Sequence, residues 1–268
     1  MGTVFTFDVR CPGQGPAAAA VDRAVDPAVD QAVDQAVEQA VDQAVEWLRW
    51  VDRTFSTYVR NSEVNRFDRG ELDLGSCCEE FASVLSLCHE MGERTAGSFD
   101  AWAGGHYDPS GLVKGWSIEE ASAMLRAAGW PDHAIDGGGD VRLAGVPCSG
   151  GAWQVGIRHP HEKGAFCAAL SLPECAVATS GNYERGPHVT DPRTGAPATA
   201  LASVTVIGPE LTSADAYATA AFAMGREAPA WLARLAGYEA LVVYAAGDGW
   251  ATPGFEGYCS PVAPLRPA

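Results

Sequence analysis

The sequence has few basic residues. It contains 18 Lys and Arg against 34 Asp and Glu, which gives a formal net charge of −16 at pH 7. Proteins bind nucleic acids by neutralising phosphates with basic side chains, and anionic membrane surfaces attract residues of the same kind. We therefore expect no nucleic-acid partner and no attachment to an anionic membrane surface.

Long apolar runs are also missing. No stretch approaches the roughly 18 uninterrupted apolar residues that a membrane-spanning helix needs. Residues 1–5 provide neither the basic nor the apolar segment of a secretion signal. We expect a cytoplasmic protein without a membrane anchor in this chain. The alternative is an exported protein whose leader has been removed.

Cysteine pairs at metal-binding or redox spacing are absent. The eight cysteines include no CxxC motif, and Cys77 and Cys78 are adjacent, which is unfavourable for an ordinary disulfide. This pattern favours reduced thiols and speaks against a zinc site. The sequence also lacks GxxxxGK[ST], HExxH, GxSxG and a GxGxxG after a strand, so the usual phosphate-binding loops, zinc proteases and α/β-hydrolases are not indicated.

The composition is that of a globular protein. Hydrophobic residues make up 47% of the chain, with eight Trp, which excludes general disorder. Expected strands and helices do not alternate strictly, which favours an α+β class with mixed, largely antiparallel sheets packed with helices. We expect one domain over residues 1–268 that ends in a loose proline-rich tail at 261–268. The expected strands are Met1–Arg10, Trp153–Arg158, Ala165–Leu172, Cys175–Thr179, Leu201–Gly208 and Glu239–Tyr244, and the expected helices are Cys77–Thr95, Ser117–Ala128, Leu211–Met224 and Ala228–Ala236.

A low-complexity tract of seven tetrads, mostly Ala-Val-Asp/Glu-Gln, occupies residues 20–47 and extends the first helix. Residues 21–46 contain seven acids and one arginine, a net charge of −6. Four residues advance a helix by about 400°, so each valine moves about 40° around the axis relative to the previous one. One face therefore cannot stay apolar along the tract. We expect firm packing only near Trp47–Trp50, and we favour replication slippage in a tolerant helix over a functional acidic tail.

Several polar clusters lie between the apolar segments. Residues 108–115 place Asp108 and Lys114 around a glycine turn that we expect just before a helix, where a phosphate near Lys114 would be favourable. Residues 136–140, Asp-Gly-Gly-Gly-Asp, are more typical of a tight strand connection than of a phosphate-binding loop. Asp215 and Thr219 share one face of an apolar helix, where two oxygen ligands can hold a hard cation. Spacing alone favours a plainer interpretation, in which the aspartate complements the helix dipole and the threonine bonds back to a carbonyl.

Taken together, the motifs resemble those of a known family. They lie in order along nearly the whole chain, at residues 1–3, 55–58, 97–100, 111–115, 138–140, 178–181, 188–195 and 214–219. The most specific part is the Asp-Pro-Arg-Thr-Gly turn at 191–195, followed by Ala-Asp-x-x-x-Thr at 214–219. The ordered set resembles the ApbE family, the FAD:protein FMN transferases, and implies that the domain is catalytic and has the ApbE-like fold.

The resemblance implies a reaction and a set of site residues. A Thr or Ser hydroxyl of an acceptor flavoprotein attacks the FMN-side phosphorus of the substrate FAD, AMP leaves, and FMN remains on the acceptor as a phosphoester. It also implies Mg²⁺ on the pyrophosphate, held by the side chains of Asp215 and Thr219 and the main-chain carbonyl of Gly111. His188 matches the histidine proposed to remove the acceptor proton, although it could instead hold its turn. The flavin and nucleotide contacts would fall on Met1, Tyr58, Ser98, Phe99, Asp100, Asp108, Lys114 and Thr190.

Two other functions remain open at this point. With water in place of the acceptor hydroxyl, the same site would be a magnesium-dependent FAD pyrophosphatase that gives FMN and AMP. A catalytically silent flavin-binding module is the other alternative, and the joint presence of the expected metal pair, Lys114 and His188 argues against it. Two departures from the family pattern are the short segment between Asp100 and Asp108 and Ala218, where some members have a further acid.

Overall fold

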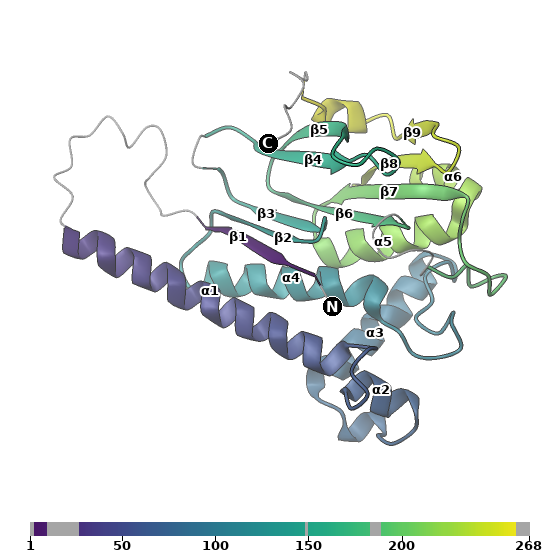
Figure 1. Cartoon of the computed structure of the whole chain (residues 1–268), viewed down its shortest axis with the longest axis horizontal. Coiled ribbons are helices and arrows are strands. Elements are labelled where there is room, and N and C mark those ends of the chain that lie inside the picture. Colours follow the sequence, from purple (N-terminus) through teal and green to yellow (C-terminus); the bar gives the residue numbers. More distant parts are fainter. Residues whose placement is uncertain (1–2, 10–26, 148–149, 183–188, 261–268) are drawn as a thin grey trace.

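A seven-stranded sheet organises the structure, a computed structural model that describes residues 3–9, 27–147, 150–182 and 189–260 (Figure 1). The strand order is β1-β2-β3-β6-β7-β8-β9, and each of these neighbouring pairs is antiparallel. The predicted α+β class with largely antiparallel sheets is confirmed. The strands of this sheet are β1 (Phe5–Val9), β2 (His133–Gly137), β3 (Val141–Ala144), β6 (Cys175–Gly181), β7 (Leu201–Gly208), β8 (Glu239–Tyr244) and β9 (Gly249–Ala251).

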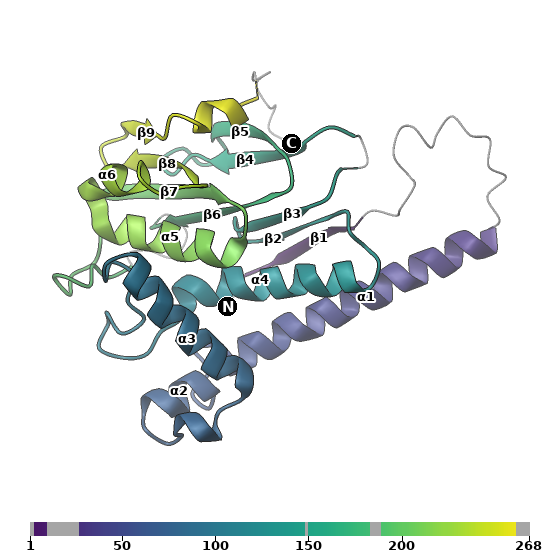
Figure 2. The same cartoon turned by 180° about the vertical axis from the view of Figure 1, so that it is seen from behind.

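Different elements pack on the two faces of the sheet. Helices α4 (Ser110–Ala127) and α5 (Leu211–Met224) pack on one face, and the hairpin of β4 (Trp153–Arg158) and β5 (Phe166–Leu172) lies over the other (Figures 1 and 2). Side chains alternate between the two faces of a strand, so one strand serves both cores. In β7, Val204 and Val206 join the core under the helices, and Ile207 joins the core under the hairpin. The remaining helices are α1 (Pro27–Phe55), α2 (Glu63–Asp68), α3 (Glu79–Arg94) and α6 (Ala228–Leu232), with short 3₁₀ turns at Leu74–Ser76, Gly225–Glu227 and Phe255–Tyr258.

Helix α1 contains most of the tetrad tract and changes its contact face along its length. Val33 and Val37 are half-buried, whereas Ala40 and Ala44 are buried and the contact continues at Leu48. The buried position thus moves from the valine of a tetrad to the preceding alanine, as the drift of about 40° per tetrad requires. Toward its N-terminal end the helix extends beyond the rest of the fold (Figure 1).

An aromatic cluster fixes the C-terminal half of α1. The rings of Trp47 and Trp50 stack with centroids 5.1 Å apart, and Trp47 meets Trp116 of α4 edge-on at 5.3 Å. The indole Nε1 of Trp47 also donates to the carbonyl oxygen of Ser117 at 3.0 Å. This cluster secures α1 against α4, the helix that borders the site described below.

The start of α4 differs from the sequence prediction. We predicted a helix over Ser117–Ala128 with a glycine turn before it, but α4 begins at Ser110. Gly111 and Lys114 therefore lie in the first turns of the helix. Glycine disfavours helix by up to about 1 kcal/mol, and here close packing against α5 overrides that preference. The Asp108 carboxylate accepts a hydrogen bond from the Ser110 N–H at 3.0 Å at the helix start.

The bounds of the other helices and strands can be compared with those predicted from the sequence. The strands at Trp153–Arg158, Leu201–Gly208 and Glu239–Tyr244 and the helix at Leu211–Met224 match their predicted bounds. Helix α6 ends at Leu232, before the predicted Ala236, and β2, β3, β9 and α2 were not predicted. Met1 and the tail at 261–268 lie outside the described residues.

The described part of the chain contains neither a disulfide nor a helix that could span a membrane. The six cysteines within it are all free, and burial raises the pKa of the Cys88 thiol to about 12. None of its helices combines the length and apolar character needed to cross a membrane. The cytoplasmic location stays a prediction.

Candidate functional site

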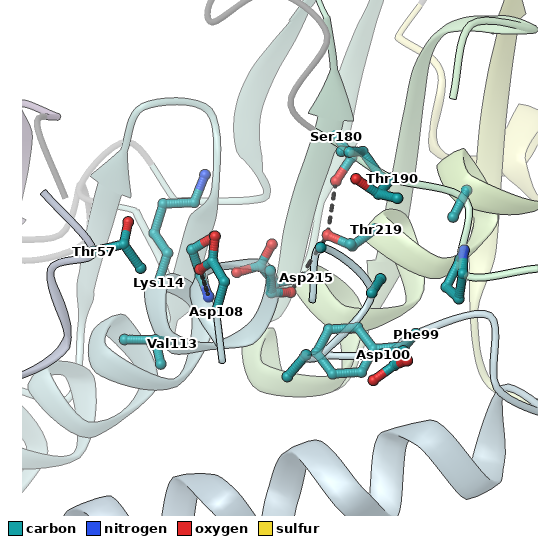
Figure 3. Close-up of a pocket in the computed structure, with 18 of the residues that line it drawn as sticks. Thr57, Phe99, Asp100, Asp108, Val113, Lys114, Ser180, Thr190, Asp215 and Thr219 are labelled. Carbon is teal, nitrogen blue, oxygen red and sulfur yellow. Dashed lines mark hydrogen bonds between the residues drawn. The ribbon is translucent and has the colours of Figure 1, made fainter. Parts of the chain in front are cut away.

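A pocket of about 260 Å³ opens where the N-terminal turns of α4 meet the middle of α5 and the end of β6 (Figure 3). Its wall also includes the segment that joins α3 to α4 and the turn that follows residue 188. Ten of the twelve site residues named from the sequence line it, and the other two, Met1 and His188, lie outside the described residues. The ten are Tyr58, Ser98, Phe99, Asp100, Asp108, Gly111, Lys114, Thr190, Asp215 and Thr219.

Two glycines allow α4 and α5 to approach closely beneath the pocket. The Gly115 N–H donates to Asp215 Oδ2 at 2.8 Å, and Thr219 Oγ1 donates to the Gly111 carbonyl oxygen at 3.4 Å. A Cβ atom on Gly115 would lie 2.6 Å from the carbonyl oxygen of Leu211, and one on Gly111 would lie 2.9 Å from Thr219 Cγ2. Neither position has room for a side chain, so the short interhelical distance depends on glycine.

The close approach brings three oxygen donors together. They are the Asp215 carboxylate, the Thr219 hydroxyl and the Gly111 carbonyl, and the Ser180 hydroxyl lies 3.1 Å from Thr219 Oγ1. Asp215 is only 4% exposed. Hard oxygen ligands with a single carboxylate suit Mg²⁺, which keeps several waters and binds substrate phosphates. The residues that the structure describes contain no cluster of three or more His, Cys, Asp or Glu able to hold a metal.

A buried ion pair holds Lys114 at the pocket. Its Nζ lies 2.8 Å from Oδ2 of Asp140, whose side chain is fully buried between β2 and β3. The other carboxylate oxygen, Oδ1, accepts the backbone N–H of Thr179 at 3.0 Å. A buried carboxylate requires such partners, because breaking a buried pair costs about 3–5 kcal/mol. The Asp-Gly-Gly-Gly-Asp turn is a strand connection, as predicted, and it also positions the lysine, a role that the sequence did not indicate.

The acidic residues at the rim are held by the local backbone. Asp100 Oδ1 accepts the Trp102 N–H at 2.8 Å, in the same way that Asp108 accepts the N–H of Ser110. Tyr58 is 89% exposed, so its ring stands at the mouth of the pocket. His106 also lines the pocket, and no sequence pattern indicated it. Its Nδ1 lies 3.0 Å from the Gly104 carbonyl oxygen.

The Asp-Pro-Arg-Thr-Gly turn is braced from outside the pocket. Arg193 donates to Asp191 at 3.1 Å and to Glu227 at 2.6 Å, and its hydrogen bond to Asp191 is the main reason that the pKa of this carboxyl is lowered. Gly195 has φ of +68°, a left-handed conformation that favours glycine. Thr190, immediately before the turn, forms a β-bridge with Pro197 and lines the pocket. The β-bridge and these partly exposed ion pairs together support the wall that Thr190 belongs to.

Comparison with known proteins identifies the family. The model of the ApbE family matches residues 1–107 and 103–242. Among solved structures, a Vibrio cholerae flavin transferase ApbE superimposes with a TM-score of 0.76 at 20% identity, covering 96% of each chain. The ApbE protein of Thermotoga maritima gives a TM-score of 0.74 at 23% identity, covering 82% of this chain and 91% of that one. The fold is thus that of the ApbE proteins, and with the family match over most of its length this chain belongs to the ApbE family.

The curated relatives share one name, FAD:protein FMN transferase. A Treponema pallidum FAD:protein FMN transferase is 36% identical over 163 residues, in a match that covers 54% of this chain and 45% of the relative. A Vibrio cholerae protein of the same name is 29% identical over 155 residues, in a match that covers 54% of this chain and 46% of the relative. The chain spans about half the length of the curated relatives it matches.

Proposed function

We propose that this protein transfers FMN from FAD to a Thr or Ser hydroxyl of a partner protein in a magnesium-dependent reaction that releases AMP. The name shared by the curated relatives supports FAD as substrate and a protein as acceptor. We further propose that residues 1–268 form one catalytic domain.

One observation carries the proposal. Asp215 and Thr219 from α5 and the Gly111 carbonyl from α4 meet in one pocket, and Lys114 lies in the same pocket. Phosphoryl transfer needs positioning and charge neutralisation more than covalent help from the protein. Oxygen donors for a hard cation beside a fixed ammonium group meet that need for a pyrophosphate substrate.

The residues that line the pocket would have three separate roles in this reaction. Asp215, Thr219 and Gly111 would hold magnesium, whose chemistry is Lewis acidity on the pyrophosphate and stabilisation of the departing AMP. Lys114 would bind a phosphate oxygen while Asp140 keeps its Nζ in place. The exposed ring of Tyr58 offers a flat surface on which the flavin or the adenine can stack.

The covalent step exchanges one P–O bond for another. The acceptor hydroxyl oxygen bonds to the FMN-side phosphorus, the bond from that phosphorus to the bridging oxygen breaks, and AMP leaves with that oxygen. We assign the acceptor proton to His188, since a histidine with an ordinary pKa of about 6.5 can accept a proton at neutral pH.

The test is a mass measurement on a candidate acceptor incubated with the protein, FAD and Mg²⁺. An acceptor mass increased by one FMN unit, with AMP released, supports the proposal. The same acceptor with its target Thr changed to Val, and a sample with EDTA, are the controls, and both must stay unmodified. Free FMN and AMP without modified acceptor would indicate the pyrophosphatase, and bound flavin without turnover would indicate the silent module.

A further inference from the structure

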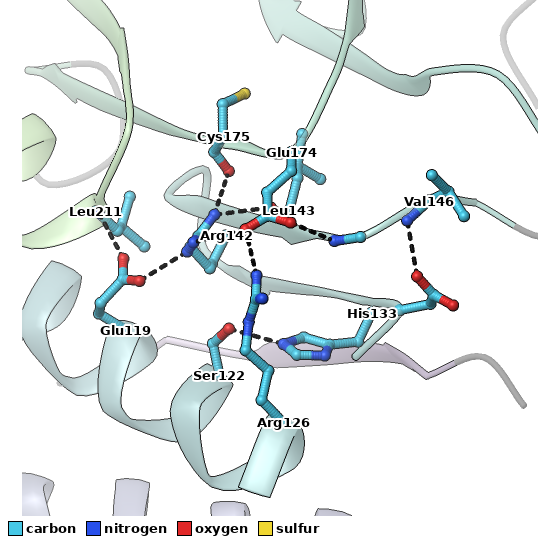
Figure 4. Close-up of polar contacts among 12 residues, drawn as sticks. Glu119, Ser122, Arg126, His133, Arg142, Leu143, Val146, Glu174, Cys175 and Leu211 are labelled. Atoms are coloured by element: carbon cyan, nitrogen blue, oxygen red, sulfur yellow. Dashed lines mark hydrogen bonds and ion pairs between the residues drawn. The ribbon is translucent and has the colours of Figure 1, made fainter. Parts of the chain in front are cut away.

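A glutamate on α4 binds the first backbone N–H of α5. Oε2 of Glu119 accepts a hydrogen bond from the N–H of Leu211 at 2.6 Å (Figure 4). Leu211 is the first residue of α5, and the first N–H groups of a helix have no acceptor within their own helix. A carboxylate is also favourable at this end of the helix dipole. The contact therefore joins the two helices that contribute the pocket's oxygen donors.

This contact continues the row of interhelical contacts under the pocket. Glu119 follows Gly115 by four residues on α4, and Leu211 precedes Asp215 by four residues on α5. The helices are antiparallel, so successive turns bring Gly111, Gly115 and Glu119 against α5 in order. The two glycine contacts limit how closely the helices approach, whereas the hydrogen bond from Leu211 opposes their separation.

The sheet holds Glu119 in place through Arg142 of β3. Nε of Arg142 lies 2.7 Å from Glu119 Oε1, and the Arg142 side chain is only 8% exposed. Its Nη1 donates to the carbonyl oxygens of Leu143 at 2.7 Å and of Cys175 at 3.0 Å. A guanidinium with several bonds at fixed angles orients the carboxylate that it pairs with. Glu119 therefore links the sheet, α4 and the start of α5.

We propose that Glu119, oriented by Arg142, is a positioning residue that sets the spacing between the magnesium ligands on α4 and α5. Glu119 is eight residues, about 12 Å along the helix, from Gly111, so it acts through the helices and not on the substrate. This inference rests on the proposed function, because it holds that the spacing of α4 and α5 serves to place the ligands of the magnesium ion. Outer contacts that orient metal ligands commonly change metal affinity by about tenfold or more when they are removed.

The test compares E119A and E119D with the wild type and with E120A, whose exposed neighbouring glutamate is a matched control. Aspartate keeps the charge but is one methylene too short to reach the Leu211 N–H and Arg142 together. Binding of FAD is followed by flavin fluorescence during a Mg²⁺ titration without acceptor, and again in EDTA. We expect E119A to raise the half-saturating Mg²⁺ concentration about tenfold, and E119D at least threefold, with FAD binding in EDTA within twofold of wild type.

The outcomes separate the inference from the function on which it rests. If FAD binding to the wild type does not depend on Mg²⁺, the proposed metal role fails and the inference fails with it. If the wild type depends on Mg²⁺ but the variants have half-saturating concentrations within twofold of it, the inference alone is overturned. Should E119A not fold, E119D decides the matter. A shift in E120A equal to that in E119A would also overturn the inference.

Discussion

The closest approach of α4 and α5 offers a substitution that separates stability from activity. In Gly115→Ala the new Cβ would lie 2.6 Å from the Leu211 carbonyl oxygen and 2.7 Å from Asp215 Cβ. Both obstacles are rigid, because one is backbone and the other is the first atom of a side chain. Ordinary contact begins near 3.4 Å, so α5 would have to move by about 1 Å.

Two effects on stability oppose each other in this variant. Overpacking a buried contact costs about 1–3 kcal/mol, and replacing a helical glycine with alanine returns up to about 1 kcal/mol. We therefore expect the free energy of unfolding to fall by at most about 3 kcal/mol. A shift of about 1 Å in ligand geometry can reduce a rate by about 10²-fold. A domain with a free energy of unfolding of about 5–15 kcal/mol stays folded after the stability loss expected here, so unfolding would not account for the loss of transfer.

The assay combines denaturant unfolding with the rate of FMN transfer. Gly92→Ala in α3 is the matched control, because its Cβ would lie 3.4 Å from the Phe99 carbonyl oxygen, an ordinary contact. This control should be as stable as wild type or slightly more stable, with an unchanged rate. A folded Gly115→Ala protein with a rate within threefold of wild type would refute the argument that glycine spacing sets the site.

The remaining predictions concern the metal, the proton and the pH. Asp215→Ala should abolish magnesium-dependent turnover, measured as AMP release over a Mg²⁺ titration, and a near-normal rate would exclude Asp215 as a ligand. His188→Ala should lose transfer while FAD still binds, measured by acceptor mass and flavin fluorescence; unchanged transfer would remove it as the base. Burial lowers the pKa of His133 below its ordinary 6.5, so the unfolded chain binds the extra proton and stability should fall as the pH drops below about 6.5. His133→Gln should flatten that fall in thermal unfolding between pH 7 and 5 and the exposed His89→Gln should not; an equal fall in both variants would contradict the assignment.

Sequence patterns predicted the elements that are apolar along most of their length. The strand at Leu201–Gly208 and the helix at Leu211–Met224 match the structure because their apolar residues are numerous and their ends are marked by turn residues. The start of α4 was missed because Gly111 and Gly115 suggest a turn locally. Their value in the fold comes from contact with a helix about one hundred residues later, which no local pattern contains.

In the candidate site, too, the residues within local motifs were predicted, whereas the contacts between distant segments were not. The motifs identified the pocket-lining residues one by one, as the shared pocket of Lys114, Asp215 and Thr219 illustrates. They included Asp140 in the segment at 138–140 but did not indicate that it holds Lys114, because an aspartate beside three glycines is typical of a tight strand connection. They also did not indicate Glu119, whose partners come from β3 and from the first turn of α5. Such contacts arise from the topology of the sheet.

The contact pattern of α1 divides that helix into two parts that differ in local stability. From residue 31 to residue 39 its side chains are at most half-buried, so these turns depend largely on the helix's own propensity. From Ala40 onward the helix shares the core that also packs under α4. Turns at the free end can therefore unfold one at a time at small cost in free energy, while the end beside the pocket opens only with the core itself. Fluctuations of α1 before Ala40 are thereby separated from the site.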